Sequence, residues 1–309
     1  MTARVLVAGD ANLDLVLRGD VVPRFGQAEQ LLEAADLVLG SSAGICAAGL
    51  ARLGVETSLV ARVGADAFGA RTRELLGEAR VGTDAVREVS GEPTGVSVIL
   101  SAPGDRAILT LTGALAGLTG DEVLAAADGA THVHVASYFL VPELARDLPA
   151  VLAALRARGL TTSLDTNWDP AERWEGVADC LPHVDVLLPN ASEALALARS
   201  LGADAADAEA AARVLAARGP VVVVKDGADG GFAVAGDERV SAPGLVLDVV
   251  DTTGAGDSFD AGFLAAWLDG RGLAEAVRWA AVAGSLSTRG SGGTGGQATR
   301  AEVEAELGA

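Results

Sequence analysis

Aromatic residues, cysteines and long apolar runs are all scarce in this chain. Aromatic side chains make up 4% of the 309 residues, so we expect an aliphatic core. The two cysteines, Cys46 and Cys180, lie far apart in apolar surroundings; this excludes a disulfide framework or zinc-ligand spacing and predicts reduced core thiols. The three histidines predict no metal cluster, and His132 and His134 are expected on one face of a strand. No apolar run approaches the ~20 residues that a membrane span needs.

Basic residues are also scarce, with 23 Lys and Arg against 42 Asp and Glu and a formal net charge of −19. That balance argues against a nucleic-acid partner or an anionic membrane surface. It leaves an anionic small molecule open, provided that backbone N–H groups, a few basic side chains or a divalent cation receive it. The first residues, "MTARVLVAGDANLDL", lead into a strand pattern without the features of a secretory signal, which favours a cytoplasmic protein.

The chain is rich in aliphatic residues, which fall into predicted strands and helices that alternate along the sequence. Half of its residues are hydrophobic, which is enough for a sizeable core. Short apolar runs alternate with Ala- and Leu-rich stretches of helical spacing, a pattern typical of an α/β fold whose parallel sheet is covered on both faces. The expected strands are 4–9, 57–64, 96–101, 107–112, 132–137, 161–166, 184–190 and 221–227, and the expected helices are 143–158, 192–201 and 204–218.

Two segments, about 12–38 and 93–112, break this alternation. Both have alternating, more polar strand patterns with no helix between the strands. We expect them to form a small antiparallel sheet beside the main one, as a lid over the strand ends. No linker and no internal repeat divides the chain, so residues 1–309 are predicted to form a single domain.

The glycine-rich stretch near the C-terminus formally matches a nucleotide motif. Residues 290–295 fit G-x-G-x-x-G, but a helical pattern precedes them, whereas the dinucleotide motif follows a strand. We therefore expect a flexible loop or one that approaches an anion. No Walker A sequence occurs, which excludes a P-loop.

The stretch "VVDTTGAGDSFDAGFLAAW", residues 249–267, combines an acidic glycine turn with an apolar helix. Gly254, Ala255 and Gly256 can present successive backbone N–H groups to an anion, and the helix N-terminus adds partial positive charge. Asp257 would then lie next to the anion as a carboxylate stabilised in its ionised form, within reach of a substrate hydroxyl as a general base. The alternative is that Asp257 only caps the helix.

This stretch resembles the C-terminal signature of the ribokinase-like (PfkB) carbohydrate kinases, which phosphorylate sugar or nucleoside hydroxyls with ATP. Further resemblances follow in the family's order along almost the whole chain: "AGDANLDLVL", "GSSAGICAAGLARLG", "GDRAILTLTGA" and "PNASEA". The resemblance implies a three-layer αβα ribokinase-like fold with a mostly parallel central sheet and a small β-sheet lid. It also implies ATP and Mg²⁺ as cofactors.

Carried over by position, Asp257 would be the general base, and Gly254, Ala255 and Gly256 would form the anion hole. Asp251 and Thr253 match positions that help to bind a monovalent cation such as K⁺ in cation-activated members. The resemblance places Asn190 and Glu193 near the nucleotide and Mg²⁺, which they would order through waters. The alternative for this pair is a helix capping box, and both readings are compatible.

The resemblance also assigns the two ends of the substrate cleft. Residues on the sugar side would be Asp14, Asn12, Gly40, Ser41 and Ser42, and residues beside the nucleotide would be Asn190, Lys225, Gly227 and Gly230. For Lys225 the alternative is a solvated lysine at a strand end, and for Asp10 it is a turn after the first strand. Asp165 and Asn167 are expected to line the cleft, whereas Arg106 contacts substrate, phosphate or only solvent.

Two positions depart from the pattern. Ser41 replaces a glycine, and Ile45 replaces an asparagine that reads sugar hydroxyls in many members, so the pocket is expected to be less polar than that of a ribose-specific relative. The predicted substrate is a sugar or sugar acid. The alternatives are a nucleoside, on which Tyr138 and Phe139 could stack unless they face the core, and a non-catalytic sugar- or nucleotide-binding protein. A homodimer through the lid is compatible with the pattern.

Overall fold

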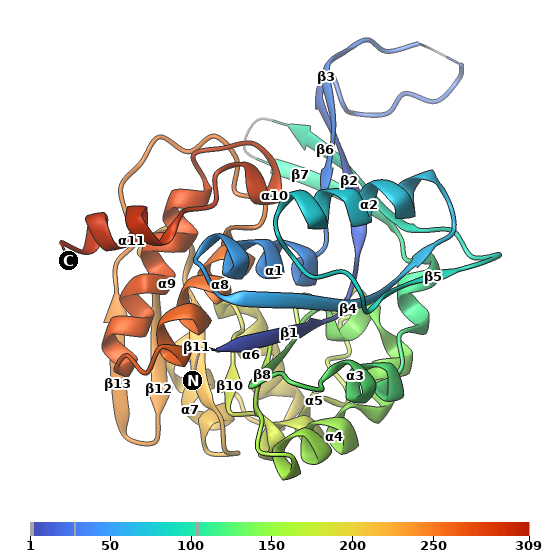
Figure 1. Cartoon of the computed structure of the whole chain (residues 1–309). Coiled ribbons are helices and arrows are strands. Elements are labelled where there is room, and N and C mark those ends of the chain that lie inside the picture. Colours follow the sequence, from blue (N-terminus) through green and yellow to red (C-terminus); the bar gives the residue numbers. More distant parts are fainter. Residues whose placement is uncertain (1–2, 28, 103–104, 309) are drawn as a thin grey trace.

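The structure, a computed structural model, describes residues 3–27, 29–102 and 105–308 and contains two sheets (Figure 1). Nine strands form the main sheet in the order β13-β12-β11-β10-β9-β8-β1-β4-β5, and four form the second sheet in the order β3-β2-β6-β7. The main-sheet strands are β1 Arg4–Ala8, β4 Glu56–Gly64, β5 Val86–Val89, β8 His132–Val135, β9 Thr161–Leu164, β10 Val186–Leu187, β11 Val221–Lys225, β12 Gly231–Ala235 and β13 Glu238–Ala242. The strands of the second sheet are β2 Asn12–Gly19, β3 Leu32–Leu39, β6 Gly95–Ala102 and β7 Asp105–Leu111.

The main sheet is parallel from β5 to β11, and β12 and β13 are added antiparallel at one edge. Its strands are apolar on both faces because helices cover both. In β1, Val5 and Val7 pack into the core on one face, and Leu6 and Ala8 pack into the core on the other. The two cores and the sheet between them make the three layers that the sequence predicted.

Helices from the two ends of the chain share one face of the sheet, and helices from its middle cover the other. The first layer contains α1 Ser42–Arg52, α2 Ala67–Glu78, α8 Ala255–Leu268, α9 Leu273–Ser287, α10 Gly292–Gly295 and α11 Arg300–Leu307. The second contains α3 Gly120–Ala126, α4 Pro142–Ala157, α5 Val177–Cys180, α6 Ala191–Ser200 and α7 Ala208–Ala216. The predicted helices at 143–158, 192–201 and 204–218 correspond to α4, α6 and α7.

The four-stranded sheet forms from the two predicted lid segments, with the β2–β3 hairpin extending farthest from the body (Figure 1). The prediction that this sheet is antiparallel is wrong at its centre, because β2 and β6 pair in parallel. Strand β2 runs out from the body, and the chain then returns through β3, α1, β4, α2 and β5 before β6 runs out in the same direction beside β2. Along β3, residues 32–37 are exposed, so this hairpin is a projecting element with little core of its own.

Three strands had no counterpart in the sequence prediction: β5, β12 and β13. The hairpin of β12 and β13 turns at Gly236, whose φ of 59° suits glycine. Strand β13 is an edge strand and contains charged and small side chains. The apolar periodicity that would have predicted it from the sequence is therefore weak. The short β5 lies at the opposite edge and is mostly exposed.

The glycine-rich stretch 290–296 contains the short helix α10 and is not the flexible loop expected from its composition. A Cβ atom on Gly293 would lie 2.2 Å from Ile45 Cδ1, and one on Gly296 would lie 2.1 Å from the Ser287 carbonyl oxygen. Close packing against α1 and α9 therefore explains these glycines. Helix α9 precedes the stretch, whereas a dinucleotide-binding motif would follow a strand, so the sequence was right to exclude that motif.

Buried His132 and His134 share the hydroxyl of Ser163, at 2.8 Å from each ring, and burial lowers their pKa values to about 3 and 4. They are neutral structural residues, and Cys46 and Cys180 are buried free thiols, as predicted. Within the described ranges, no helix is both long and apolar enough to cross a membrane.

Helices α8 and α9 approach each other through Gly262, where a Cβ would lie 2.7 Å from Ala283 Cβ and 2.8 Å from the Trp279 carbonyl oxygen. We predict that Gly262→Ala lowers the free energy of unfolding by about 1–3 kcal/mol because the helices must separate. Gly77→Ala in α2 is the control: no atom lies within 4 Å of its Cβ position, so better helix propensity should stabilise by up to about 1 kcal/mol. Urea unfolding measures both, and equal effects would contradict the packing argument.

Candidate active site

Helix α8 begins at the carboxyl edge of the main sheet without a side-chain cap. Its N-cap is Gly254, at φ 71°, and no described side chain accepts a hydrogen bond from its first turn. Helices α1, α2, α3, α6, α7 and α11 each begin with such a cap. The N–H groups of Gly256 and Asp257 have no side-chain partner among the described residues, whereas Ala255 N donates to the Thr252 carbonyl oxygen at 3.3 Å. The helix dipole adds positive potential at this turn. A helix start without a side-chain cap is compatible with an anion site, and the anion hole at Gly254, Ala255 and Gly256 stays a prediction.

Asp257 lies in this first turn and is 9% exposed. Burial raises its pKa to about 8, and the nearby Asp165 carboxylate raises it further, whereas Lys225 and a hydrogen bond with the Ser42 side chain oppose the rise. The alternative that Asp257 caps α8 is wrong, because Gly254 is the cap residue. The expectation that the helix end stabilises its ionised form is also wrong, since desolvation and neighbouring acids outweigh the dipole.

A buried ion cluster lies directly beneath this turn. Lys225 Nζ, at the end of β11, donates to Asp165 Oδ2 at 2.7 Å and to Asp260 Oδ2 at 3.1 Å. Both carboxylates are 1% exposed, so the alternative of a solvated lysine is wrong. Asp165 follows β9 as predicted, but sequence reasoning missed Asp260. The sequence feature that could have identified Asp260 is its position, as an acid three residues after Asp257 inside an otherwise apolar helix.

Asn190 and Glu193 form a capping box at the start of α6. Asn190 N donates to Glu193 Oε2 at 2.8 Å, and Glu193 N donates to Asn190 Oδ1 at 2.9 Å. Burial raises the pKa of Glu193 to about 7, with a further contribution from Asp165. Of the described residues, no three His, Cys, Asp or Glu converge as metal ligands. Mg²⁺ would therefore need oxygens from a phosphate and water besides Glu193, a hard-ligand set of the kind it prefers.

The predicted sugar-binding residues meet where β1 passes into β2. Asn12 Nδ2 donates to Asp14 Oδ1 at 3.2 Å and to Ser97 Oγ at 3.4 Å. Gly40 is required here, because its Cβ would lie 2.1 Å from Asp14 Oδ1. Asp10 accepts from the Ala43 N–H at 3.0 Å, so it joins β1 to α1. Burial raises the pKa of Asp14 to about 7, and the charge of Asp10 adds to the rise.

The two residues that depart from the family pattern lie side by side at the start of α1. Ser41 has a φ of 68°, a conformation that favours glycine, and its hydroxyl caps α1 by accepting from Gly44 N at 3.0 Å. Ile45 is buried against the anion-hole turn, with Cγ2 2.9 Å from the position of a Cβ on Gly254. Ile45 thus packs against Gly254 and Gly293, beside the predicted anion hole.

Two arginines from the lid reach the loop before α8. Arg106 Nη1 donates to Thr253 Oγ1 at 3.0 Å, and Arg18 Nη2 lies 3.8 Å from Asp251 Oδ2. Asp251 also accepts from the N–H groups of Thr253 and Gly292, both at 2.9 Å, and these bonds outweigh burial and lower its pKa. Arg106 is thus not merely solvated. The monovalent-cation site at Asp251 and Thr253 stays a prediction, and the arginines bring positive charge to the same place.

The ends of β8 and β9 meet in a strained pair. Ser137 and Asn167 have φ values of 59° and 55°, and Ser137 N donates to Asn167 Oδ1 at 2.7 Å. Tyr138 is buried in the core with its ring edge-on to Phe139, so it does not stack on a base. Trp168, 48% exposed and absent from the predicted site, lies next to Asn167 and is an aromatic face available at the cleft rim.

Gly227 and Gly230 lie in the turn after β11, with φ values of 59° and 86°. A Cβ on Gly230 would lie 2.2 Å from the Ala242 carbonyl oxygen, so this glycine is needed for the close approach of β13. A nucleotide contact by either residue stays a prediction.

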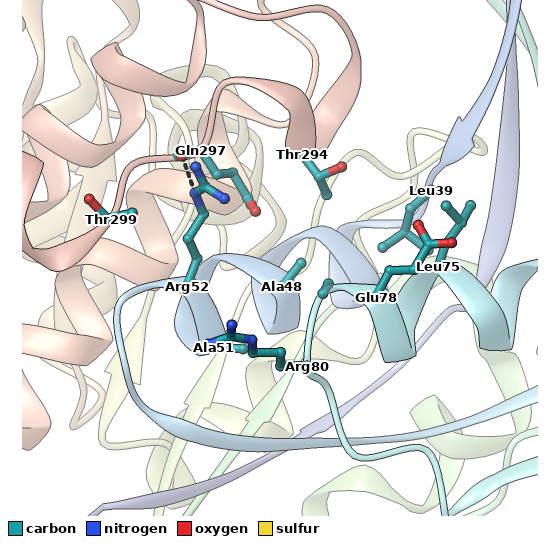
Figure 2. A pocket seen from close by; sticks show the side chains of 11 residues that line it. Leu39, Ala48, Ala51, Arg52, Leu75, Glu78, Arg80, Thr294, Gln297 and Thr299 are labelled. Atoms are coloured by element: carbon teal, nitrogen blue, oxygen red, sulfur yellow. Dashed lines mark hydrogen bonds between the residues drawn. The ribbon is translucent and has the colours of Figure 1, made fainter.

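A cavity of 480 Å³ lies between α1, α2 and the segment after α10, and it contains no predicted site residue (Figure 2). Arg52 points from α1 to the Gln297 carbonyl oxygen in this view. Gln297, which sequence reasoning missed, is buried and donates to the Ile45 carbonyl oxygen at 2.8 Å and to Ser258 Oγ at 3.3 Å. It thereby joins α1 to α8 at the residue that follows Asp257.

Comparisons with known proteins agree with this geometry. The ATP-dependent ribose-1-phosphate kinase of Halopiger xanaduensis is 33% identical over 290 residues, covering 92% of this chain and 91% of that protein. The solved structure of Arabidopsis thaliana ribokinase with ribose and ATP has a TM-score of 0.85 at 28% identity, over 99% of both chains. The adenosine kinase of Sinorhizobium meliloti has a TM-score of 0.85 at 26% identity, over 100% of both chains.

The fold, a nine-stranded sheet with a four-stranded sheet beside it, is thus shared with a ribokinase and an adenosine kinase. The model of the pfkB family carbohydrate kinases matches residues 3–300, and the chain belongs to that family. It is therefore a carbohydrate kinase.

The conformation of Ser41 leads to two opposite predictions. Ser41→Gly should raise the free energy of unfolding by about 1 kcal/mol, because relief of the positive φ outweighs the few tenths that glycine costs as a cap. Ser41→Ala keeps the strain and loses the cap, so it should lower that free energy by about 1 kcal/mol. Urea unfolding distinguishes the two, and a destabilised glycine variant would show that Ser41 is not strained.

Proposed function

We propose that this kinase transfers the γ-phosphoryl group of ATP to a hydroxyl of a small sugar or sugar acid. Asp257 acts as the general base, and the backbone N–H groups of Gly254–Gly256 form the anion hole. The observation that carries the proposal is the first turn of α8, where N–H groups without a side-chain cap and a buried carboxylate lie together. A protein that only binds its ligands has no need of that carboxylate.

The step is a single displacement. The hydroxyl proton passes to the Asp257 carboxylate, the substrate oxygen bonds to the γ-phosphorus, and the bond to the bridging oxygen breaks to release ADP. Mg²⁺, when bound, would neutralise phosphate charge, and Glu193 and Asn190 would hold it through waters. Arg106 would add charge from the lid, and Gly227 and Gly230 border the nucleotide in this proposal.

On the acceptor side, Asp14 and Asn12 would bind hydroxyls, supported by Gly40, Ser41 and Ser42. The residues 1–309 would work as one domain, with the lid segments closing over this end to exclude water. We place the protein in the cytoplasm, where ATP is available. Ribose, bound in the Arabidopsis thaliana ribokinase structure, and ribose 1-phosphate, for which the Halopiger xanaduensis kinase is named, are the first acceptors to test.

A nucleoside kinase is the second candidate. The similarity to an adenosine kinase favours it, since its TM-score equals that of the ribokinase. The exposed ring of Trp168 offers a face for a base, whereas buried Tyr138 does not. A panel of sugars, sugar acids, sugar phosphates and nucleosides with ATP and Mg²⁺, with and without K⁺, separates these candidates by ADP release. No turnover on any acceptor would favour the binding protein.

Asp257→Asn should lower kcat by ~10²-fold or more, because the general base is lost, while the KM for ATP stays nearly unchanged. Asp121→Asn is a matched control, since Asp121 is an exposed acid in the first turn of α3. It should retain wild-type kcat. An active Asp257→Asn enzyme would remove Asp257 from the mechanism.

The pH dependence follows from the same group. With its pKa raised to about 8, Asp257 is mostly protonated at pH 6 and becomes the required carboxylate as the pH rises through 8. We expect kcat to rise across pH 6–9 in the wild type and the residual kcat of Asp257→Asn to lack this limb. A flat wild-type profile would contradict the assignment if chemistry limits the rate.

The lid supports a further prediction, a homodimer. Ile108, Leu109 and Leu111 on β7 are 51–61% exposed, and Leu37 on β3 is 40% exposed. Light scattering should give twice the chain mass for the wild type and one chain mass for Leu109→Glu/Leu111→Glu. Phe68→Glu, at an exposed apolar residue outside the lid, should leave the mass unchanged. A monomeric wild type would overturn the dimer.

A further inference from the structure

The chain contains a single lysine, and that lysine is buried. Of its 23 basic residues, 22 are arginine and one is Lys225. The Lys225 side chain is 11% exposed, at the end of β11. An arginine would bring a wide planar fork to this place, whereas an ammonium is a compact group with three donors. A sequence that otherwise uses arginine for positive charge therefore has its one lysine at a position that is 11% exposed and bonded to two acids.

The contacts of Lys225 join three separate elements. Its ammonium donates to Asp165 after β9 and to Asp260 in α8, and its Cδ lies 3.4 Å from the Cβ position of Gly256. Asp260 and Asp257 are three residues apart and so share one side of α8. An interaction that holds Asp260 in place therefore also holds the face of α8 on which Asp257 lies.

Asp260 has one oxygen satisfied and one without a hydrogen-bond partner among the described residues. Burial raises the pKa of Asp260 well above its ordinary value, whereas Lys225 holds that of Asp165 below it. Removal of Lys225 would leave the buried Asp165 carboxylate beside a second acid and without a cation. Such a change is expected to displace the first turn of α8, since an unpaired buried charge is costly. The anion hole and Asp257 both belong to that turn.

We propose that Lys225 is a positioning residue: from beneath Gly256 its ammonium ties Asp165 to Asp260 and holds the first turn of α8 in register for phosphoryl transfer. This inference rests on the proposed role of Asp257. It replaces the expectation that Lys225 contacts the nucleotide, because its ammonium already has two carboxylate partners.

Lys225→Met tests the proposal by separating kcat from KM. We expect kcat to fall ~10²-fold, the effect of a misplacement of about 1 Å, with the KM values for acceptor and ATP within about threefold of wild type. Lys225→Met/Asp260→Asn removes one acid together with the cation; it should regain stability to urea yet keep the low kcat. Arg278→Met removes a positive charge from the exposed face of α9 and should behave as wild type.

Two kinetic outcomes would overturn the proposal. A raised KM for ATP with a wild-type kcat would make Lys225 a nucleotide contact. Wild-type kinetics in the folded double variant would leave it a purely structural ion pair. Asp257→Asn, assayed alongside, keeps the two proposals apart: if that variant retains wild-type kcat, the proposed function has failed, whatever Lys225 does.

Because the chain has one lysine, protein labelled with ¹⁵N-lysine should give one side-chain ammonium signal. The two carboxylate bonds should protect that signal from exchange with water, and a non-hydrolysable ATP analogue should shift it little. Rapid exchange, or a large shift with the analogue, would contradict the positioning role without reference to activity.

Discussion

Helix α8 is buried along Asp257–Ala266 between α1 and α9, so its first turn cannot move without disturbing the core. The rest of the site is arranged around that constraint. Glycines at 254, 262 and 293 allow α8, α9, α10 and Ile45 to approach closely, and Gln297 joins α1 to α8. A helix so held can leave its first N–H groups without a cap, because packing rather than capping stabilises its start.

The second feature of the site is its excess of buried acid. Asp10, Asp14, Asp165, Asp257 and Asp260 are all buried near one another, and burial opposes ionisation in each of them. Lys225 keeps Asp165 ionised from within the core, since it holds the pKa of that carboxyl below its ordinary value despite burial. Arg18 and Arg106 bring positive charge from the lid. The four-stranded sheet thereby places two cations against the loop before α8.

The sequence predicted most of the fold, and the site residues that it proposed stay predictions. Apolar strands that alternate with helices required a parallel sheet with two covered faces, and the polar segments 12–38 and 93–112 did form a separate sheet. The weak edge strands β5, β12 and β13 were missed because exposed or mixed side chains carry little periodic signal. The pairing of β2 with β6 was also beyond the pattern, since register and direction depend on how the chain returns.

What the sequence determined by itself was local: the glycine turn, the acid after it, the capping box of Asn190 and Glu193, and the strand ends where ligands bind. Tertiary structure decided which charged side chains lie close enough to form ion pairs and to shift each other's pKa. The pKa of Asp257 is raised, Lys225 bonds to two carboxylates and Arg106 reaches Thr253 because residues 35 to 147 positions apart meet in the fold. Spacing along a chain cannot report such meetings, because desolvation and Coulomb energy depend on distances in the folded protein.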